Sequence, residues 1–157
     1  MSAVLKASTA RLVPMTKADL SAVMAIENDI YDFPWTRGNF EDSLHAGYSA
    51  WLYFVGTEVI GYCVVMLAVD EAHLLNLSIG RDMQGQGHGR ALLEAAMEAI
   101  GERGAKAMLL EVRPSNAVGR KLYASAGFAQ IGLRKDYYPA LRGKEDALVL
   151  RRGLSKP

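Results

Sequence analysis

The segment at positions 84–89, Gln-Gly-Gln-Gly-His-Gly, has three glycines at alternate positions and lies between an apolar run and a helical pattern. Glycine lets a backbone adopt positive φ angles and approach a ligand closely. The first N–H groups of a helix lack partners within the helix and carry partial positive charge. The segment therefore predicts a backbone site for an anion. A flexible turn between a strand and a helix is the simpler alternative.

Two common nucleotide-binding patterns do not fit this loop. The dinucleotide pattern Gly-x-Gly-x-x-Gly requires a third glycine where the chain has Arg90. A Walker loop that starts at Gly80 and reaches Gly85 requires lysine next, and the chain has Gln86 there. The pattern that remains is Gln-x-x-Gly-x-Gly, with Gln84 as its first residue.

Glu111 interrupts the otherwise apolar run 107–112, which is typical of a buried strand. Burial raises the pKa of a carboxyl group, so we expect Glu111 to be a usable proton acceptor near neutral pH. The simpler interpretation is a glutamate at a strand end that pairs with Arg113 or reaches solvent.

Tyr123 lies in the helical pattern 117–126, where an aromatic residue is most often part of the core. A phenol can also donate a proton to a departing thiolate, because their reference pKa values of about 10 and about 8.5 are close. Asn116 precedes the same helix, and its default role is the helix cap, with a ligand contact as the alternative.

Periodicity and turn residues predict the elements that carry these groups. A capping box of Thr16 and Asp19 opens a first helix, Thr36 caps a second, and Gly104 ends a third. The expected strands are 10–13, 48–55, 59–69, 74–79, 107–112, 128–134 and 146–150, and the later helices are 89–103 and 117–126. Strand, helix and strand in this order predict a right-handed crossover between two parallel or splayed strands. The fold class is α/β with a mixed sheet.

Two aromatic segments fall outside these elements. Residues 31–36, Tyr-Asp-Phe-Pro-Trp-Thr, interrupt the helical pattern and form either a plug in the core or a wall of the substrate site, and we favour the plug. The segment 137–139, Tyr-Tyr-Pro, is expected to be a loop between the two closing strands.

Length and composition favour one domain. The chain has 157 residues, of which 50% are hydrophobic, and shows neither a long apolar run nor a secretory pattern, so we expect a cytoplasmic protein without a membrane span. The single cysteine, Cys63, cannot form an intrachain disulfide and is expected to pack as a small apolar residue. Neither zinc-ligand spacing nor a Gly-x-Ser-x-Gly elbow occurs, so metal and serine-hydrolase chemistry are not expected.

Charge is unevenly distributed along the chain. Residues 1–112 carry 8 Lys and Arg against 14 Asp and Glu, whereas residues 113–157 carry 10 against 3. The basic end could attract an anionic ligand such as a CoA phosphate or lie near RNA, although scattered solvated charge is the favoured interpretation. No arginine-rich run indicates direct nucleic-acid readout.

Four motifs that follow one another in order resemble those of the GNAT acetyltransferases. They are Leu-Leu-Asn-Leu-Ser-Ile at 74–79, the glycine loop with Arg-Ala-Leu-Leu at 84–93, Leu-Glu-Val-Arg-Pro-Ser-Asn at 110–116, and Leu-Tyr-Ala-Ser-Ala-Gly-Phe at 122–128. The segments 33–36, 136–139 and 143–147 are most similar to the branch of this family that acetylates the N-terminal alanine of a small-subunit ribosomal protein. The resemblance covers residues 10–151. It implies one GNAT domain over 1–157, with a mixed, mostly antiparallel twisted sheet whose central strands splay apart between flanking helices.

The resemblance also implies a role for each site residue. Glu111 would be the general base and Tyr123 the general acid. The backbone of Leu77, Ser78 and Ile79 would run beside the pantetheine arm of acetyl-CoA. The remaining implied residues are Gln84, Gly85, Gln86, Gly87, His88, Gly89 and Arg90 for the pyrophosphate, Asn116 for a further cofactor contact, and Trp35, Tyr137 and Tyr138 as walls of the acceptor site. Gly85, His88 and Gly119 differ from the residues expected at their positions, and no metal is implied.

The implied reaction is direct attack of an amine on the acetyl-CoA thioester. At pH 7 an α-amine is roughly 10–15% neutral and a lysine side chain only ~0.04% neutral, a difference of ~3.5 kcal/mol that favours a protein N-terminus as the acceptor. Two alternatives remain open at this point. One is an N-acetyltransferase for small amines such as polyamines or aminoglycosides, and the other is a non-catalytic acyl-CoA-binding module.

Overall fold

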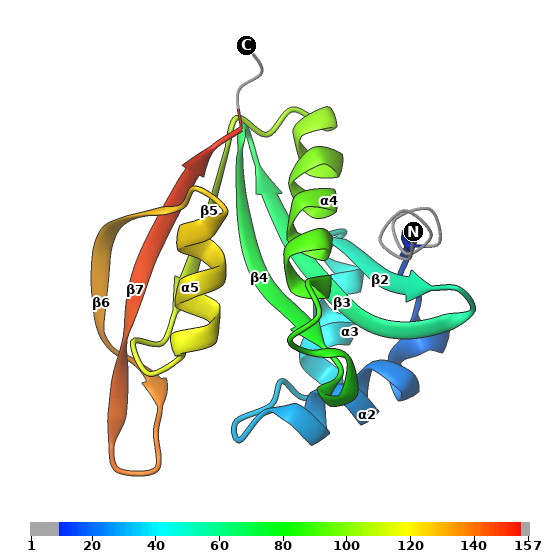
Figure 1. Cartoon of the computed structure of the whole chain (residues 1–157), viewed down its shortest axis with the longest axis horizontal. Coiled ribbons are helices and arrows are strands. Elements are labelled where there is room, and N and C mark those ends of the chain that lie inside the picture. Colours follow the sequence, from blue (N-terminus) through cyan, green and yellow to red (C-terminus); the bar gives the residue numbers. More distant parts are fainter. Residues whose placement is uncertain (1–9, 155–157) are drawn as a thin grey trace. The chain divides into compact units, whose positions relative to one another are not determined.

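A computed structural model describes residues 10–154 of the chain (Figure 1). The strands are β1 (Ala10–Pro14), β2 (Ser49–Val55), β3 (Glu58–Ala68), β4 (Glu71–Ile79), β5 (Ala107–Val112), β6 (Ala129–Pro139) and β7 (Lys144–Gly153). The helices are α2 (Leu20–Ile30), α3 (Arg37–His45), α4 (His88–Glu102) and α5 (Ala117–Ser125), with short 3-10 turns η1 (Lys17–Asp19) and η2 (Arg81–Met83). Most expected elements are present within one to three residues of their predicted ends.

The strands form a 7-stranded sheet in the order β1-β2-β3-β4-β5-β7-β6. Neighbours β1 and β2, β2 and β3, β5 and β7, and β6 and β7 are antiparallel, whereas β4 and β5 are parallel. The mixed, mostly antiparallel α/β sheet predicted from the sequence is therefore confirmed. The parallel pair joins Glu71–Leu74 to Ala107–Leu110, as the strand-helix-strand order predicted. The splay expected farther along these strands stays a prediction.

The chain divides into two compact units, each described separately. The first unit comprises residues 1–65 and 76–96, and the second comprises residues 66–75 and 97–157. Strands β3 and β4 and helix α4 each contribute residues to both units. A single domain over 1–157 stays a prediction.

Helix α2 of the first unit begins after the predicted capping box, in which the Thr16 N–H donates to the Asp19 carboxylate at 2.8 Å. The buried residues of this helix are Leu20, Val23 and Glu27, and the glutamate is 1% exposed. Thr36 caps helix α3 as predicted, because its hydroxyl accepts the Asn39 N–H at 3.1 Å.

Helix α4 follows the glycine loop directly (Figure 1). Leu93, Met97 and Ile100, which are spaced at i, i+4 and i+7 on one face of the helix, are buried. Gly104 has φ of 106°, the left-handed conformation expected after a helix end. In strand β3, Cys63 is buried and behaves as the predicted small apolar residue, since burial raises the pKa of its thiol to about 12.

The expected loop at 137–139 was a wrong prediction. These residues belong to strand β6, which pairs with β7 up to Pro139 opposite Lys144. The register shifts between Arg134 and Tyr138, and Asp136 takes φ of 52° within that irregularity while its N–H donates to Asp146 Oδ1 at 2.9 Å. The sequence suggested a strand end because the charged residues 135–136 interrupt the pattern, whereas a bulge lets pairing resume beyond them.

Candidate active site

The glycine loop of the first unit has a defined backbone conformation. Gly85 and Gly87 take φ of 75° and 86°, and an added Cβ at either position would meet no atom within 4 Å. Glycine is therefore required there by backbone conformation and not by crowding. The loop is also held by a polar side chain, because the Gln84 amide donates to the Ile79 carbonyl at 2.9 Å. An exposed loop of this shape at the start of a 15-residue helix fits an anionic group.

His88 and Arg90 of the loop use their side chains within the first unit. His88 is 7% exposed, and its Nδ1 lies 3.3 Å from the Tyr53 hydroxyl. Arg90 Nε lies 3.1 Å from Glu94 Oε2, one helical turn farther along α4. The His88 imidazole therefore packs against strand β2, so any contact of His88 with an anion would use its backbone.

Strand β4 carries Leu77, Ser78 and Ile79, the residues expected beside the pantetheine arm. Ser78 and Ile79 are buried. Strand β3 approaches them closely at Gly61, where an added Cβ would lie 2.5 Å from the Ser78 carbonyl oxygen and 2.7 Å from Ile79 Cδ1. Only glycine fits at this position without moving the backbone of β4.

The aromatic segment 31–36 is partly packed and partly exposed. The Trp35 ring is half-buried, with its centroid 5.0 Å from that of Phe40, which is fully buried. Phe33 is 41% exposed. Trp35 thus packs as the plug interpretation predicted, whereas Phe33 does not.

Glu27 is a buried polar residue that the sequence interpretation missed as a site residue. Its Oε1 accepts the Tyr62 hydroxyl at 2.7 Å and the Asn76 amide at 3.2 Å, and its Oε2 accepts the Trp35 N–H at 2.8 Å. The available signal was an acidic residue on the apolar face of a helix. Its partners could not be found by local spacing, because they come from three other segments.

Glu111 of the second unit lies between two basic side chains. His73 pairs with Leu109 across the parallel strands, which puts His73 and Glu111 on the same face of the sheet. His73 Nε2 lies 2.5 Å from Glu111 Oε1, and Arg134 Nε lies 3.2 Å from Glu111 Oε2. The Glu111 side chain is 8% exposed.

The expected rise in the pKa of Glu111 was wrong. Burial does raise this pKa, but the hydrogen bond and charge of His73, followed by those of Arg134, outweigh burial and hold the pKa below its usual value. The simpler interpretation was correct that Glu111 is paired but named the wrong partner, since Arg113 Nη1 instead lies 3.2 Å from Glu145 Oε1. His73 and Arg134 lie 38 and 23 residues from Glu111 in sequence, so spacing gave no signal for either.

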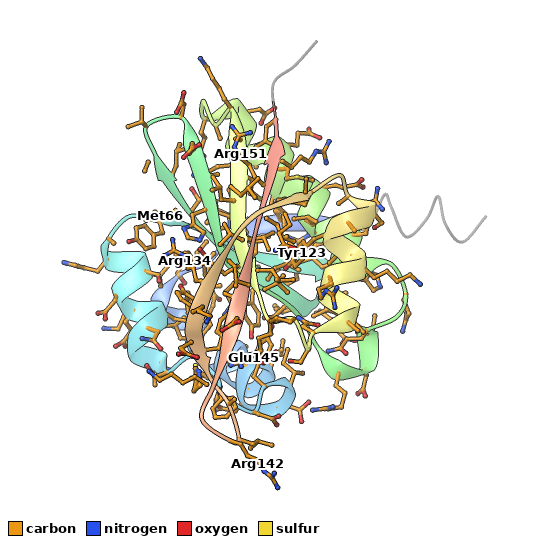
Figure 2. The ribbon with its side chains drawn as sticks, turned by 90° about the vertical axis from the view of Figure 1, so that its left-hand side faces the viewer. Met66, Tyr123, Arg134, Arg142, Glu145 and Arg151 are labelled. Atoms are coloured by element: carbon orange, nitrogen blue, oxygen red, sulfur yellow. The ribbon has the colours of Figure 1, made fainter. Side chains whose placement is uncertain are left out.

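Helix α5 carries Tyr123 and is capped by Asn116. The Asn116 side chain accepts the Gly119 N–H at 2.9 Å, which confirms its default role as the cap. An added Cβ at Gly119 would lie 2.5 Å from Asn116 Nδ2, which explains a glycine within this helix. Tyr123 is half-buried, with its ring edge-on to Phe128 at 5.7 Å. Figure 2 shows Tyr123 on α5, and Arg134 and Glu145 on the neighbouring strands of the same unit.

Tyr137 and Tyr138 lie beside each other on β6, with ring centroids 4.9 Å apart and planes at 83°. The Arg113 guanidinium stacks over the Tyr138 ring at 4.4 Å, and that of Arg134 lies 5.7 Å from the Tyr137 ring. Tyr137 is 48% exposed, so the pair presents one accessible ring beside two cations.

Each unit gathers part of the predicted site. The first unit contains the glycine loop, residues 77–79 and Trp35, and the second contains Glu111, Tyr123, Asn116, Tyr137 and Tyr138. Within residues 10–154, no group of three or more His, Cys, Asp or Glu side chains is arranged to hold a metal ion. None of the helices in that same range is long and apolar enough to cross a membrane.

Comparison with known proteins identifies relatives over most of the chain. The sequence model of the acetyltransferase (GNAT) family matches residues 20–128. The [ribosomal protein bS18]-alanine N-acetyltransferase of Escherichia coli K12 is 36% identical over 132 residues, which are 84% of this chain and 89% of that protein. The enzyme of the same name from Haemophilus ducreyi is 34% identical over 137 residues, which are 87% and 94% of the two chains.

Solved structures show the same relationship. The crystal structure of the ribosomal-protein-S18-alanine N-acetyltransferase from Escherichia coli has a TM-score of 0.87 and 32% identity, covering 94% of this chain and 96% of that one. Ard1 from Thermoplasma volcanium shares the fold, with a TM-score of 0.85 at 21% identity and coverage of 94% and 99%. On the family match, the relatives and the fold, the chain belongs to the GNAT family of acetyltransferases.

Proposed function

We propose that this protein transfers the acetyl group of acetyl-CoA to the N-terminal alanine of a ribosomal protein of the bS18 type. The observation that carries the proposal is the similarity to bS18-alanine N-acetyltransferases over most of both chains. A ribosomal acceptor assigns the reaction to the cytoplasm. It requires neither a metal ion nor direct nucleic-acid readout.

Acetyl-CoA is the acetyl donor in this proposal. The positive φ angles of Gly85 and Gly87 and the start of helix α4 support a pyrophosphate contact at residues 84–90. The backbone of residues 77–79 accompanies the pantetheine arm, and a backbone N–H near Leu77 polarises the thioester carbonyl. Asn116 supplies a further cofactor contact in addition to its role as a cap.

The acceptor amine attacks the thioester carbon directly, so no acyl-enzyme is formed. Glu111 receives the amine proton, and Tyr123 donates a proton to the departing CoA thiolate. A low pKa of Glu111 is compatible with this role, because the amine becomes strongly acidic as its bond to the carbonyl carbon forms. Roughly 10–15% of an α-amine is neutral at pH 7 and can attack without losing a proton first. Glu111 therefore does not have to deprotonate an ammonium group before the attack, as it would with a lysine side chain. Trp35, Tyr137 and Tyr138 contact the acceptor peptide.

The test uses the full-length protein, acetyl-CoA and a peptide that begins with alanine and contains an internal lysine. Release of CoA is followed with a thiol reagent, and mass spectrometry locates the acetyl group. We expect acetylation of the α-amine. The matched control is the same peptide with a blocked N-terminus, which should give little CoA release.

Polyamines and aminoglycosides are assayed in parallel. Rapid turnover of these amines, with none on the alanine peptide, would show that the enzyme acts on small amines. Binding of CoA without turnover on any amine would instead indicate an acyl-CoA-binding module.

A further inference from the structure

Glu27 is a buried carboxylate whose contacts are not explained by the proposed chemistry. It is 1% exposed, and within residues 10–154 its hydrogen-bond donors are all neutral: the Trp35 N–H, the Tyr62 hydroxyl and the Asn76 amide. A buried carboxylate is costly unless its oxygens are well hydrogen-bonded, and these three donors provide that compensation. All four residues belong to the first unit.

A chain of hydrogen bonds ends at the Glu27 carboxylate, and in each bond the donor lies on the side farther from Glu27. The Ser78 hydroxyl donates to Asn76 Oδ1 at 2.6 Å, so its oxygen is left to accept the Tyr31 hydroxyl, which lies 2.6 Å away. Asn76 in turn donates its amide to Glu27 Oε1 at 3.2 Å. Tyr31 therefore donates to Ser78, Ser78 to Asn76 and Asn76 to the Glu27 carboxylate, which is the final acceptor. Such chains polarise their members and strengthen each bond.

These bonds fix both ends of the aromatic segment 31–35. Tyr31 is held at one end through Ser78 of strand β4, and Trp35 is held at the other through its backbone N–H. The Trp35 ring is anchored as well, because it packs on Phe40, which lies edge-on to Tyr62 at 5.8 Å. The Tyr62 hydroxyl donates to Glu27 Oε1, so the positions of both the backbone and the ring of Trp35 depend on the same carboxylate.

We propose that Glu27 is a positioning residue for the acceptor amine, acting by holding the segment 31–35 in place along residues 76–78 of strand β4. The inference rests on the proposed function, in which Trp35 contacts the acceptor and residues 77–79 accompany acetyl-CoA. Glu27 itself touches neither substrate, because it is fully buried.

The role requires a carboxylate. An ionised carboxylate only accepts hydrogen bonds, and its two oxygens can serve all three donors. Glutamine has nearly the same shape, but its NH₂ group would face one of these donors. The phenols remain donors over the working pH range, since burial raises the pKa of Tyr31 to about 12 and raises that of Tyr62 further.

Three variants separate positioning from general stability. Glu27→Gln disturbs the whole arrangement, and Tyr31→Phe removes the hydroxyl that contacts Ser78 at 2.6 Å and the Leu77 carbonyl at 3.3 Å, both on strand β4. Ser43→Ala is the control, because it removes a buried hydroxyl of the first unit that donates to the Asn39 carbonyl at 2.9 Å within helix α3, and not to Glu27 or the segment 31–35. Each variant is assayed for the KM of the alanine peptide and of acetyl-CoA, and for hydrogen exchange of the Trp35 amide.

Glu27→Gln should raise the KM of the peptide by about tenfold, the size expected for loss of one good hydrogen bond, with less than a twofold change for acetyl-CoA. Tyr31→Phe should change the peptide KM in the same direction by about threefold. The Trp35 amide should exchange at least ten times faster in Glu27→Gln, because its acceptor is weakened. Ser43→Ala should lower the melting temperature and leave the peptide KM and the exchange rate of the Trp35 amide unchanged.

An unchanged peptide KM in Glu27→Gln would overturn the proposal, as would an equal rise of the peptide KM in Ser43→Ala. If the wild-type protein turns over no α-amine peptide, the proposed function fails. Hydrogen exchange then still decides whether Glu27 holds the segment, since that readout does not depend on turnover.

Discussion

His73 Nε2 lies 2.5 Å from Glu111 Oε1, and Arg134 Nε lies 3.2 Å from the other carboxylate oxygen. Two donors thus hold one carboxylate on a face of the sheet where its side chain is 8% exposed. This arrangement favours the ionised form of Glu111. The candidate base is therefore ready to accept a proton at neutral pH, and its side chain is fixed by partners from two other strands.

Replacing Glu111 with glutamine should abolish most of the turnover and leave CoA binding intact. The substitution keeps the size of the side chain but removes the proton acceptor, and loss of a general base typically costs about 10²–10⁴ in rate. The measurements are kcat with the alanine peptide and calorimetric titration with CoA. Full turnover in Glu111→Gln would exclude Glu111 as the base, and a parallel loss of CoA binding would indicate a structural defect.

Removing His73 should raise the pKa of Glu111. His73→Ala deletes a hydrogen bond and a charge that lower this pKa, whereas burial, which raises it, remains. Carbon NMR of the Glu111 carboxyl follows its titration directly. The dependence of log(kcat/KM) on pH should change as well. Below the pKa of the acceptor amine this plot has a slope of one, and below the pKa of Glu111 the slope increases to two. The pH at which the slope increases should therefore be higher in His73→Ala.

Arg134→Ala should shift the pKa of Glu111 in the same direction by a smaller amount. The control is His45→Ala, at an exposed histidine of the first unit, which should not shift this pKa.

The pKa of Glu111 also determines how the free energy of unfolding depends on pH. Because the pKa of folded Glu111 lies below its usual value, its pairing stabilises the fold above that usual value, and this stability is lost as pH falls through the folded pKa. A downward shift of the Glu111 pKa in His73→Ala would contradict the role of His73 in lowering that pKa.

Residues that act through neighbours in the sequence were predictable, and residues that act through distant partners were not. Thr36 and Asn116 each accept the N–H of the residue three positions later in the helix that they cap, so their roles followed from local spacing. The glycine loop was likewise a local pattern. The pKa of Glu111 was predicted with the wrong sign because its partner His73 lies 38 residues away and meets it only through strand pairing. Glu27 was missed as a site residue for the same reason.

Gly61→Ala should destabilise the protein and weaken acetyl-CoA binding. An added methyl group would lie 2.5 Å from the Ser78 carbonyl oxygen, a backbone atom that can move only with strand β4. Overpacking of this kind costs about 1–3 kcal/mol in the free energy of unfolding. The expected outcome is a lower denaturant midpoint together with a higher KM for acetyl-CoA, since residues 77–79 are the proposed pantetheine contacts.

Gly132→Ala in strand β6 is the matched control, because an added Cβ there would lie 3.8 Å from the nearest atom of Val149, an ordinary contact. This variant should change neither quantity by more than a small amount. If both variants behaved alike, the close approach of β3 to β4 at Gly61 would not be what requires glycine.

Gly119→Ala and Gly101→Ala should have different effects although both replace a glycine within a helix. At Gly101 an added Cβ meets no atom within 4 Å, so alanine should stabilise helix α4 by about 0.5–1 kcal/mol. At Gly119 the same gain in helix propensity is opposed, because the new methyl group would displace the Asn116 side chain that caps α5. Loss of such a cap costs about 1 kcal/mol, so Gly119→Ala should be neutral or destabilising in urea unfolding.

The double variant Asn116→Ala with Gly119→Ala isolates the cause. Once the Asn116 side chain is absent, the methyl group at position 119 has no atom of that side chain to displace. The double variant should therefore be more stable than Asn116→Ala, by about the amount that Gly101→Ala adds to the wild-type protein. The coupling between the two positions should therefore be about 1 kcal/mol, and strictly additive effects would show that the cap and the glycine are independent. Asn116→Ala alone should also weaken CoA binding if this residue contacts the cofactor, whereas Gly101→Ala should not.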